Sequence, residues 1–338
     1  MKSRAREGDL IESLDGLIFD VKGLIHPPNS IVAFPRYFPD EKGERRRKGM
    51  SFSKVYSLAE RYALMKIKYP QYLVYDPVFD ETLCEVPLAR IKKHHDPVKG
   101  LAKLFHSKHL DPLQKNAVQA MELLKRETTI PWDKMGISGS ILLSLHASKS
   151  DIDPIVYGSE NCRKTHSALK MLLKDEDSPF KVYSREELKV LFDFRSKDNA
   201  GTFEDFVRTE SRKVMQGKFM GTDYFMRFVK DWNEIDEEYG DFQYRNMGNA
   251  TIRATIIDDS EAIFTPCKYK VENVIIIEGS TEPAEIVSFR GRFCEQARNG
   301  EAVAAQGKLE GITDRRRKDT HYRLLIGNKP SDYMIITG

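Results

Sequence analysis

Short apolar segments separated by turn residues open the chain. Residues 14–21 place an Asp-Gly step between two apolar arms, which is typical of a β-hairpin. Residues 31–38 indicate another strand, and Pro35 inside it favours an edge position or a bulge, because proline cannot donate to a strand ladder. Helical spacing of apolar residues over 53–68 predicts an amphipathic helix. These elements predict a small α+β domain over residues 1–90.

From residue 91 the apolar spacing becomes helical. A basic, helical stretch is expected over 91–126, followed by alternating strands and helices. The βαβ-like order of that block predicts a right-handed crossover. The expected elements are strands at 135–138 and 152–157 and helices at 141–145, 161–173, 185–194 and 202–216. A strongly strand-like segment over 219–229 completes a second predicted domain, residues 91–245.

The last third of the chain changes to short apolar strands with Gly, Asp and Asn turns. Their regular spacing predicts an antiparallel β barrel or sandwich over residues 246–338. The fold class expected for the whole chain is therefore multidomain α+β and α/β.

Composition narrows the protein class. The chain has 338 residues, a 40% apolar fraction and a net charge of +3, so packed cores are expected and no global field favours nucleic acid. Four scattered cysteines support neither a zinc site nor a disulfide framework. The polar N-terminus does not resemble a signal peptide, and no apolar run reaches membrane-spanning length. We expect a cytoplasmic protein with no membrane partner, and the sequence leaves its oligomeric state open.

The local basic runs and the histidines are interpreted first as solvent-exposed or packing residues. Residues 45–48 and 315–318 are Arg/Lys runs, and a solvated hairpin tip is favoured for the first over contact with RNA or triphosphate. The four histidines within 94–109 are interpreted as surface or packing residues, with metal binding less favoured.

The chemistry concentrates at residues 139–153. Gly139 permits a close backbone approach, and Ser140 could cap a helix whose N–H groups favour phosphate. Asp151 and Asp153 are two residues apart, so on a strand both point to one face. Two carboxylates on one face repel unless a cation lies between them, and Mg²⁺ takes oxygen ligands and substrate phosphates. The pattern therefore predicts nucleotidyl transfer from a metal-bound triphosphate.

This stretch resembles the DNA polymerase β-like nucleotidyltransferase superfamily. Ten residues separate Ser140 from Asp151, as in that superfamily's Gly-Ser and Asp-x-Asp pattern; Pro154 departs from the apolar residue usual there. The chain is also similar to uncharacterised archaeal proteins described as predicted nucleotidyltransferases. That resemblance rests on three further segments, residues 15–19, 264–267 and 288–293.

The resemblance implies a polymerase β-like palm core and specific roles. Asp151 and Asp153 would bind Mg²⁺ or Mn²⁺, with a third carboxylate on a later strand. Asp223 is the candidate for that third ligand, although a turn residue is an equal interpretation; its rivals are Asp193, Asp231, Glu234 and Asp236. The residues expected to bind the nucleotide are Gly139, Ser140, Lys149, Arg208, Arg212 and Lys218.

Three functions stay open. The first is an enzyme that moves a nucleoside monophosphate from an NTP onto a hydroxyl of RNA, protein or a small molecule. The second is a non-catalytic nucleotide- or RNA-binding protein on the same scaffold. The third is a structural or interaction protein in which the motif is incidental.

Overall fold

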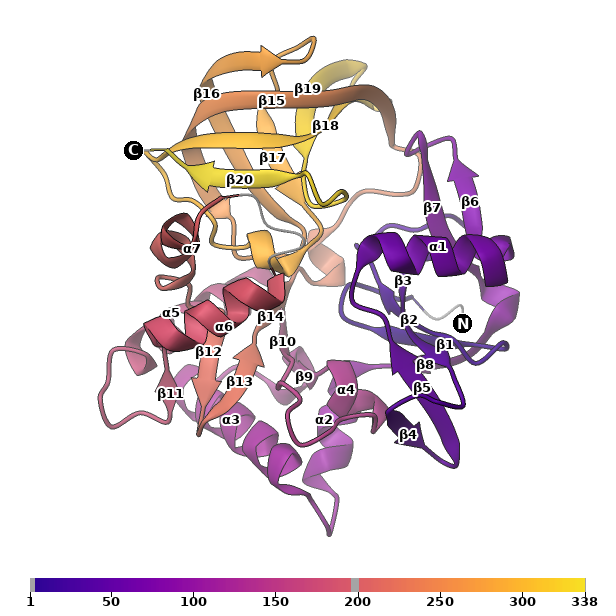
Figure 1. The fold of residues 1–338 in the computed structure, drawn as a ribbon, viewed down its shortest axis with the longest axis vertical. Coiled ribbons are helices and arrows are strands. Elements are labelled where there is room, and N and C mark those ends of the chain that lie inside the picture. Colours follow the sequence, from indigo (N-terminus) through magenta and orange to yellow (C-terminus); the bar gives the residue numbers. More distant parts are fainter. Residues whose placement is uncertain (1–3, 196–200, 338) are drawn as a thin grey trace. The chain divides into compact units, whose positions relative to one another are not determined.

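The chain folds as an α+β protein with several separate sheets (Figure 1). The computed structural model describes residues 4–195 and 201–337. Its contacts divide the chain into two compact units. The first unit comprises residues 1–74, 84–182 and 214–236, and the second comprises 75–83, 183–213 and 237–338. The first unit thus joins most of the two segments, 1–90 and 91–245, that the sequence suggested as separate domains.

An antiparallel sheet dominates the N-terminal part of the first unit. Its strand order is β4-β5-β3-β2-β1-β8, and the β6–β7 hairpin joins it through β3. Its strands are β1 (Leu10–Ser13), β2 (Ile18–Val21), β3 (Ser30–Pro39), β4 (Arg45–Arg47), β5 (Met50–Lys54), β6 (Leu73–Asp76), β7 (Glu81–Pro87) and β8 (Ile91–His95). The predicted Asp-Gly hairpin is confirmed, since β1 and β2 pair antiparallel and Gly16 has φ +80°.

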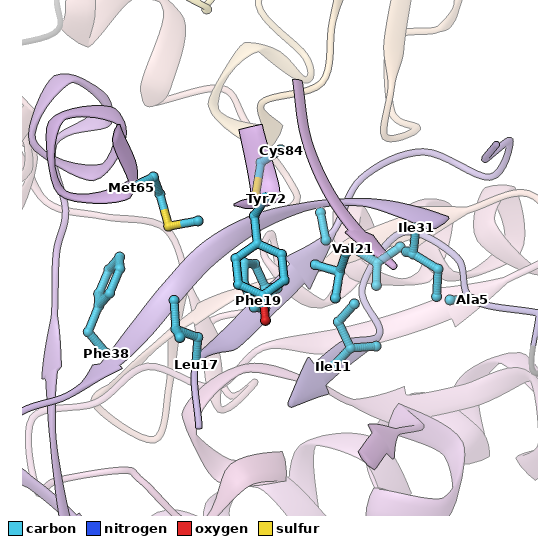
Figure 2. Packing of buried hydrophobic residues seen from close by; sticks show 12 residues of the cluster. Ala5, Ile11, Leu17, Phe19, Val21, Ile31, Phe38, Met65, Tyr72 and Cys84 are labelled. Carbon is cyan, nitrogen blue, oxygen red and sulfur yellow. The ribbon is translucent and has the colours of Figure 1, made fainter. Parts of the chain in front are cut away.

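The two faces of this sheet bury different partners. On one face the rings of Phe19 and Tyr72 meet edge to face, and Met65 of α1 (Leu58–Lys68) joins the same cluster (Figure 2). The other face packs Ile18 and its neighbours against Leu143 and Leu145, which lie far away in the sequence. The second face therefore positions the N-terminal sheet against the 139–153 segment.

Arg36 is the extra residue of a β-bulge in β3. Ile18 pairs with Tyr37, whereas the next residue, Phe19, pairs with Pro35, so Arg36 has no partner of its own in the ladder. The expected bulge near Pro35 is confirmed. Because bulges redirect side chains, often beside functional sites, the direction of Arg36 differs from that in a regular strand.

The helix predicted over 91–126 is wrong at its start. Residues 91–95 form β8 and pair with β1, so tertiary pairing overrides the helical spacing. The helices of this region are α2 (Pro97–Phe105), capped by Asp96, and α3 (Pro112–Thr128), which begins with a capping box at Asp111. Asp-Pro steps at both helix starts were the available signals.

A second, three-stranded sheet holds the 139–153 segment. Its order is β14-β10-β9, with β9 (Met135–Ile137) antiparallel to β10 (Pro154–Tyr157) and β14 (Arg227–Val229) parallel to it. The short helix α4 (Gly139–Leu143) follows β9, and α5 (Ser159–Leu172) packs on β10 and β14. The predicted crossover between the first two strands is wrong, because an antiparallel pair needs none.

The strand-like segment 219–229 is divided between three strands. A turn at Met220-Gly221 separates β12 (Gln216–Phe219) from β13 (Thr222–Phe225), and β14 follows in the other sheet. β11 (Phe180–Lys181) pairs with β12.

The described residues of the second unit include two α-helices and a curled sheet. The helices are α6 (Arg185–Arg195) and α7 (Phe203–Glu210), the latter ending before the predicted residue 216. The sheet order is β15-β16-β17-β19-β18-β20, and β15 also pairs with β18, so the sheet curls back on itself. Within this sheet, the β17–β19 pair is the only parallel one among the pairings of its described residues. The strands are β15 (Phe242–Glu261), β16 (Cys267–Glu278), β17 (Glu285–Ser288), β18 (Ala302–Asp314), β19 (Asp319–Leu325) and β20 (Tyr333–Ile336).

Candidate functional site

Gly139 and Asp153 lie in direct contact. At the end of β9 the Ser138 N–H donates to the Asp153 carbonyl at 2.9 Å, which fixes the two segments side by side. Gly139 adopts φ +62°, and a Cβ atom at this position would lie 1.7 Å from Asp153 Oδ2. Only glycine fits here, since a side chain would occupy the space of the carboxylate.

Asp151 and Asp153 point away from the core on the same side. The residue between them, Ile152, is fully buried and forms a parallel bridge with Tyr224. Its N–H donates to the Asp223 carbonyl and its carbonyl accepts from the Phe225 N–H, both at 2.9 Å. Because side chains alternate along an extended chain, the residues that flank Ile152 point to the opposite face.

These two carboxylates have no direct partner. Within residues 4–195 and 201–337, neither side chain makes a hydrogen bond or an ion pair. Burial and the Asp151 carboxylate raise the pKa of Asp153 to about 7, although Arg36, Arg227 and Lys54 act in the opposite direction. The pair is thus a site of repulsion between partly buried charges, which a cation between them would relieve.

Four cations surround the carboxylate pair, and they come from the N-terminal sheet and β14. Arg45 of β4 donates to Ser150 Oγ at 3.0 Å and to the Leu145 carbonyl at 3.4 Å. Arg227 of β14 forms ion pairs with Glu7 and Asp20 at 3.2 and 3.3 Å. The other two, Arg36 of the bulge and Lys54 at the end of β5, interact electrostatically with Asp151 and Asp153.

A small pocket is lined by Asp153 together with two of these cations, Arg36 and Arg227. Its lining combines residues of the N-terminal sheet, the bend after β9, Asp153 and β14. The lining residues are Leu10, Asp20, Arg36, Tyr37, Ser138, Gly139, Asp153 and Arg227. The pocket therefore joins a carboxylate of the predicted motif to cations that the motif does not contain.

Asp223 is adjacent to the pair along the backbone but differs in its surroundings. Its carbonyl bonds to Ile152, whereas its side chain is 53% exposed and pairs with Lys218 at 3.4 Å. Among the described residues, no group of three or more His, Cys, Asp or Glu side chains is arranged to hold a metal ion. The role of Asp223 as third ligand stays a prediction.

The rival carboxylates have other partners. Asp231 forms an ion pair with Arg6 at 3.1 Å and another with Lys134, and Glu234 accepts from the Ser159 N–H at the start of α5. Asp193, on α6 of the second unit, pairs with Lys189 at 2.6 Å.

The residues predicted to bind the nucleotide are distributed over both units. Ser140 is buried, and its Oγ has no hydrogen-bond partner among the described residues. Lys149 is exposed in the turn before Asp151. Arg208 lies on α7 of the second unit, and Arg212, just beyond that helix, pairs with Glu301, with an Nη2–Oε2 distance of 2.7 Å. Their binding roles stay predictions.

Sequence reasoning missed the cations of the N-terminal sheet. The favoured interpretation of residues 45–48 as a solvated tip is wrong for Arg45 and for Arg47, which pairs with Glu12 at 2.6 Å. Arg36 could have been suspected from the proline before it, since a bulge redirects the next side chain. Nothing in the sequence pattern singles out Lys54.

Comparison with known proteins places the chain in a family. It is 32% identical over 335 residues to the uncharacterised protein MJ1086 of the archaeon Methanocaldococcus jannaschii, and the match covers 97% of this chain and 96% of the relative. This chain belongs to the MJ1086 family. No family model matches the chain, and no solved structure matches it.

Membership of the MJ1086 family covers both compact units, because the match extends over nearly the whole length of both proteins. It confirms the expected likeness to an uncharacterised archaeal protein. No helix among the described residues of this MJ1086-family protein is long and apolar enough to cross a membrane.

Proposed function

We propose that this protein is a metal-dependent nucleotidyltransferase with a polymerase β-like catalytic core. It would move a nucleoside monophosphate from an NTP to a hydroxyl acceptor on RNA, protein or a small molecule. The contact between Gly139 and the Asp153 carboxylate carries the proposal, because the bend and the acidic pair are ten residues apart in sequence and adjacent in space. That adjacency is the physical requirement of the motif.

Asp151 and Asp153 fit a divalent cation. Two carboxylates that share a face, without an ion pair to another described residue, provide the one or two protein ligands that Mg²⁺ commonly uses beside substrate phosphates. Bound Mg²⁺ or Mn²⁺ would neutralise the triphosphate and lower the pKa of the attacking hydroxyl. Gly139 leaves room for the Asp153 carboxylate, and Ile152 anchors both acids to the sheet through its bridge to Tyr224.

The reaction balances without another reactant. The acceptor oxygen forms a bond to the α-phosphorus while the bond from that phosphorus to the β-bridging oxygen breaks. The electron pair leaves with pyrophosphate, and the acceptor proton passes to solvent.

The non-catalytic alternative has one observation in its favour. The Asp223 side chain is 53% exposed and paired with Lys218, rather than grouped with Asp151 and Asp153 as a third carboxylate. A protein with two acidic ligands could bind a metal–nucleotide complex without turning it over.

Label transfer tests the proposal. The full chain is incubated with each α-labelled NTP and Mg²⁺, with cell RNA or protein extract as acceptor. The double variant Asp151→Asn/Asp153→Asn should transfer no label. The matched control is Asp175→Asn/Asp177→Asn, an exposed pair with the same spacing. Binding of Mg²⁺–ATP without transfer would favour the non-catalytic alternative, and equal transfer by both double variants would refute the proposal.

A further inference from the structure

We propose that Arg36 and Lys54 of the N-terminal sheet bind the polyphosphate tail of the donor nucleotide. This inference rests on the proposed function and assigns its phosphate-binding half to residues outside the predicted motif. It also gives the N-terminal sheet a function that its sequence did not reveal.

Arg36 and Lys54 lie close together in the N-terminal sheet. Arg36 lines the pocket together with Asp153, and it is the extra residue of the β3 bulge. Lys54 pairs in register with Tyr37, the residue next to Arg36. The two cations therefore lie on adjacent strands at the same end of the sheet.

Among the described residues, both cations lack a direct anionic partner. In the described part of the chain, neither Arg36 nor Lys54 makes a hydrogen bond or an ion pair with a carboxylate. The Lys54 ammonium lies 4.7 Å from the centre of the Tyr56 ring, which leaves its hydrogen-bond capacity unused. By contrast, Arg45 and Arg227 are already bonded to other groups.

Placing Arg36 and Lys54 together costs free energy. Arg36 and Lys54 repel one another, and burial lowers the pKa of Lys54 to about 8 despite the Asp151 and Asp153 carboxylates nearby. Partly buried cations without direct partners cost stability, so such an arrangement is explained by an anion that binds there. A phosphate chain matches it, because guanidinium groups bind phosphate oxygens in pairs and ammonium groups supply point charge.

The neighbouring carboxylate pair restricts which anion can bind to these cations. Asp151 and Asp153 would repel a bare phosphate, so an anion is favoured here only when it brings a metal ion. A triphosphate with a divalent cation satisfies both the acids and the two cations. Inorganic phosphate or a lone RNA phosphate satisfies only part of this charge distribution.

The test measures binding of ATP and of inorganic tripolyphosphate to the full chain by calorimetry, with and without Mg²⁺. The variant Arg36→Gln/Lys54→Gln should bind Mg²⁺–ATP about 100-fold more weakly, at about tenfold for each charged contact. The matched control Arg46→Gln/Lys66→Gln removes one exposed Arg and one exposed Lys and should bind as the wild type does. Without Mg²⁺, Asp151→Asn/Asp153→Asn should bind tripolyphosphate more tightly than the wild type, because repulsion is removed.

The outcomes separate the two proposals. Equal Mg²⁺–ATP affinity of Arg36→Gln/Lys54→Gln and the control pair overturns the inference, as does the absence of tripolyphosphate binding by the wild type in the presence of Mg²⁺. The inference is also overturned if Arg36→Gln/Lys54→Gln loses binding to RNA but keeps the wild-type affinity for Mg²⁺–ATP. If Arg36→Gln/Lys54→Gln binds weakly while Asp151→Asn/Asp153→Asn keeps full Mg²⁺-dependent binding, the metal-site proposal fails and the anion site stands. The variant Arg36→Lys keeps the positive charge but loses the planar guanidinium that binds two phosphate oxygens. If this variant binds ATP more weakly at an unchanged melting temperature, a folding defect is excluded as the cause.

Discussion

The Asp153 carboxylate occupies the space in which a side chain at residue 139 would begin. A Cβ atom on Gly139 would lie 1.7 Å from Oδ2 and 2.6 Å from Cγ of Asp153, closer than atoms can approach. The glycine of the motif is therefore needed for the position of the acid, in addition to any role at phosphate.

Gly139→Ala should displace the Asp153 carboxylate and abolish Mg²⁺-dependent nucleotide binding. The control is Gly49→Ala, because Gly49 also has a positive φ, +78°, but a Cβ atom there would meet no other atom within 4 Å. Both variants carry a backbone strain of about 1–2 kcal/mol, and only Gly139→Ala adds the collision. Calorimetry and thermal melting check this, and equal loss in both variants would contradict it.

Asp153→Asn should lose nucleotidyl transfer while its melting temperature stays the same or rises. The reason is that the half-buried Asp153 carboxylate lies beside Asp151, and the amide removes a charge that the fold disfavours. A residue kept for stability would behave in the opposite way. Thermal melting at pH 8 without metal is the measurement, and a clear drop in melting temperature would argue that Asp153 is structural.

Arg227→Met should destabilise the first unit by about 3–5 kcal/mol, as removal of one member of a buried ion cluster commonly does. Arg227 pairs with Glu7, whose side chain is fully buried, and with Asp20. Both acids would lose a counter-charge, although Lys22 still pairs with each at 3.0 Å. Denaturant titration gives the change, and Arg126→Met, which removes an exposed pair with Glu127, serves as the control.

Protonation of His26 should lower the stability as the pH drops from 6.5 to 4, whereas Asp153, with its pKa raised to about 7, acts in the opposite direction. Burial lowers the pKa of His26 to about 4 from 6.5, while its hydrogen bond to the Ala5 carbonyl acts in the opposite direction. Between these values the unfolded chain binds a proton that the folded chain excludes, so stability is lost as the pH falls. The loss should reach about 3 kcal/mol for this histidine.

His26→Gln should remove the histidine's contribution to the pH dependence, because glutamine can donate to the Ala5 carbonyl and accept from the Val32 N–H without titrating. Some slope should persist through His95, since burial lowers the pKa of its imidazole to about 4 as well. The exposed His109→Gln is the control and should leave the slope unchanged. Denaturant unfolding at successive pH values checks the difference between variants.

The sequence predicted the local part of the candidate site and missed its long-range part. The antiparallel pairing of β9 with β10 brings Gly139 and Asp153 together. Because these two strands are close in sequence, the spacing of the motif was enough to predict that the two residues are neighbours. Arg36 and Lys54 reach the same place only through packing of the N-terminal sheet against Leu143 and Leu145. Packing between distant segments leaves no periodic signal in the chain.

The same distinction explains the errors in the fold. The hairpin at Gly16 was predictable because a positive φ favours glycine in a tight turn. Residues 91–95 were not, since their strand depends on pairing with β1 far away in sequence. The curled C-terminal sheet followed from regular turn spacing, but the parallel pairing of β17 and β19 did not.

The bulge in β3 makes chain length a requirement of the candidate site. Because Arg36 is one residue in excess over the paired β2, deletion of a single residue here would restore regular pairing. The deletion would keep the sheet and its apolar core yet turn the arginine position away from the acids. Relatives that carry out the same chemistry should therefore tolerate exchanges of side chains along this strand more readily than a change in its number of residues.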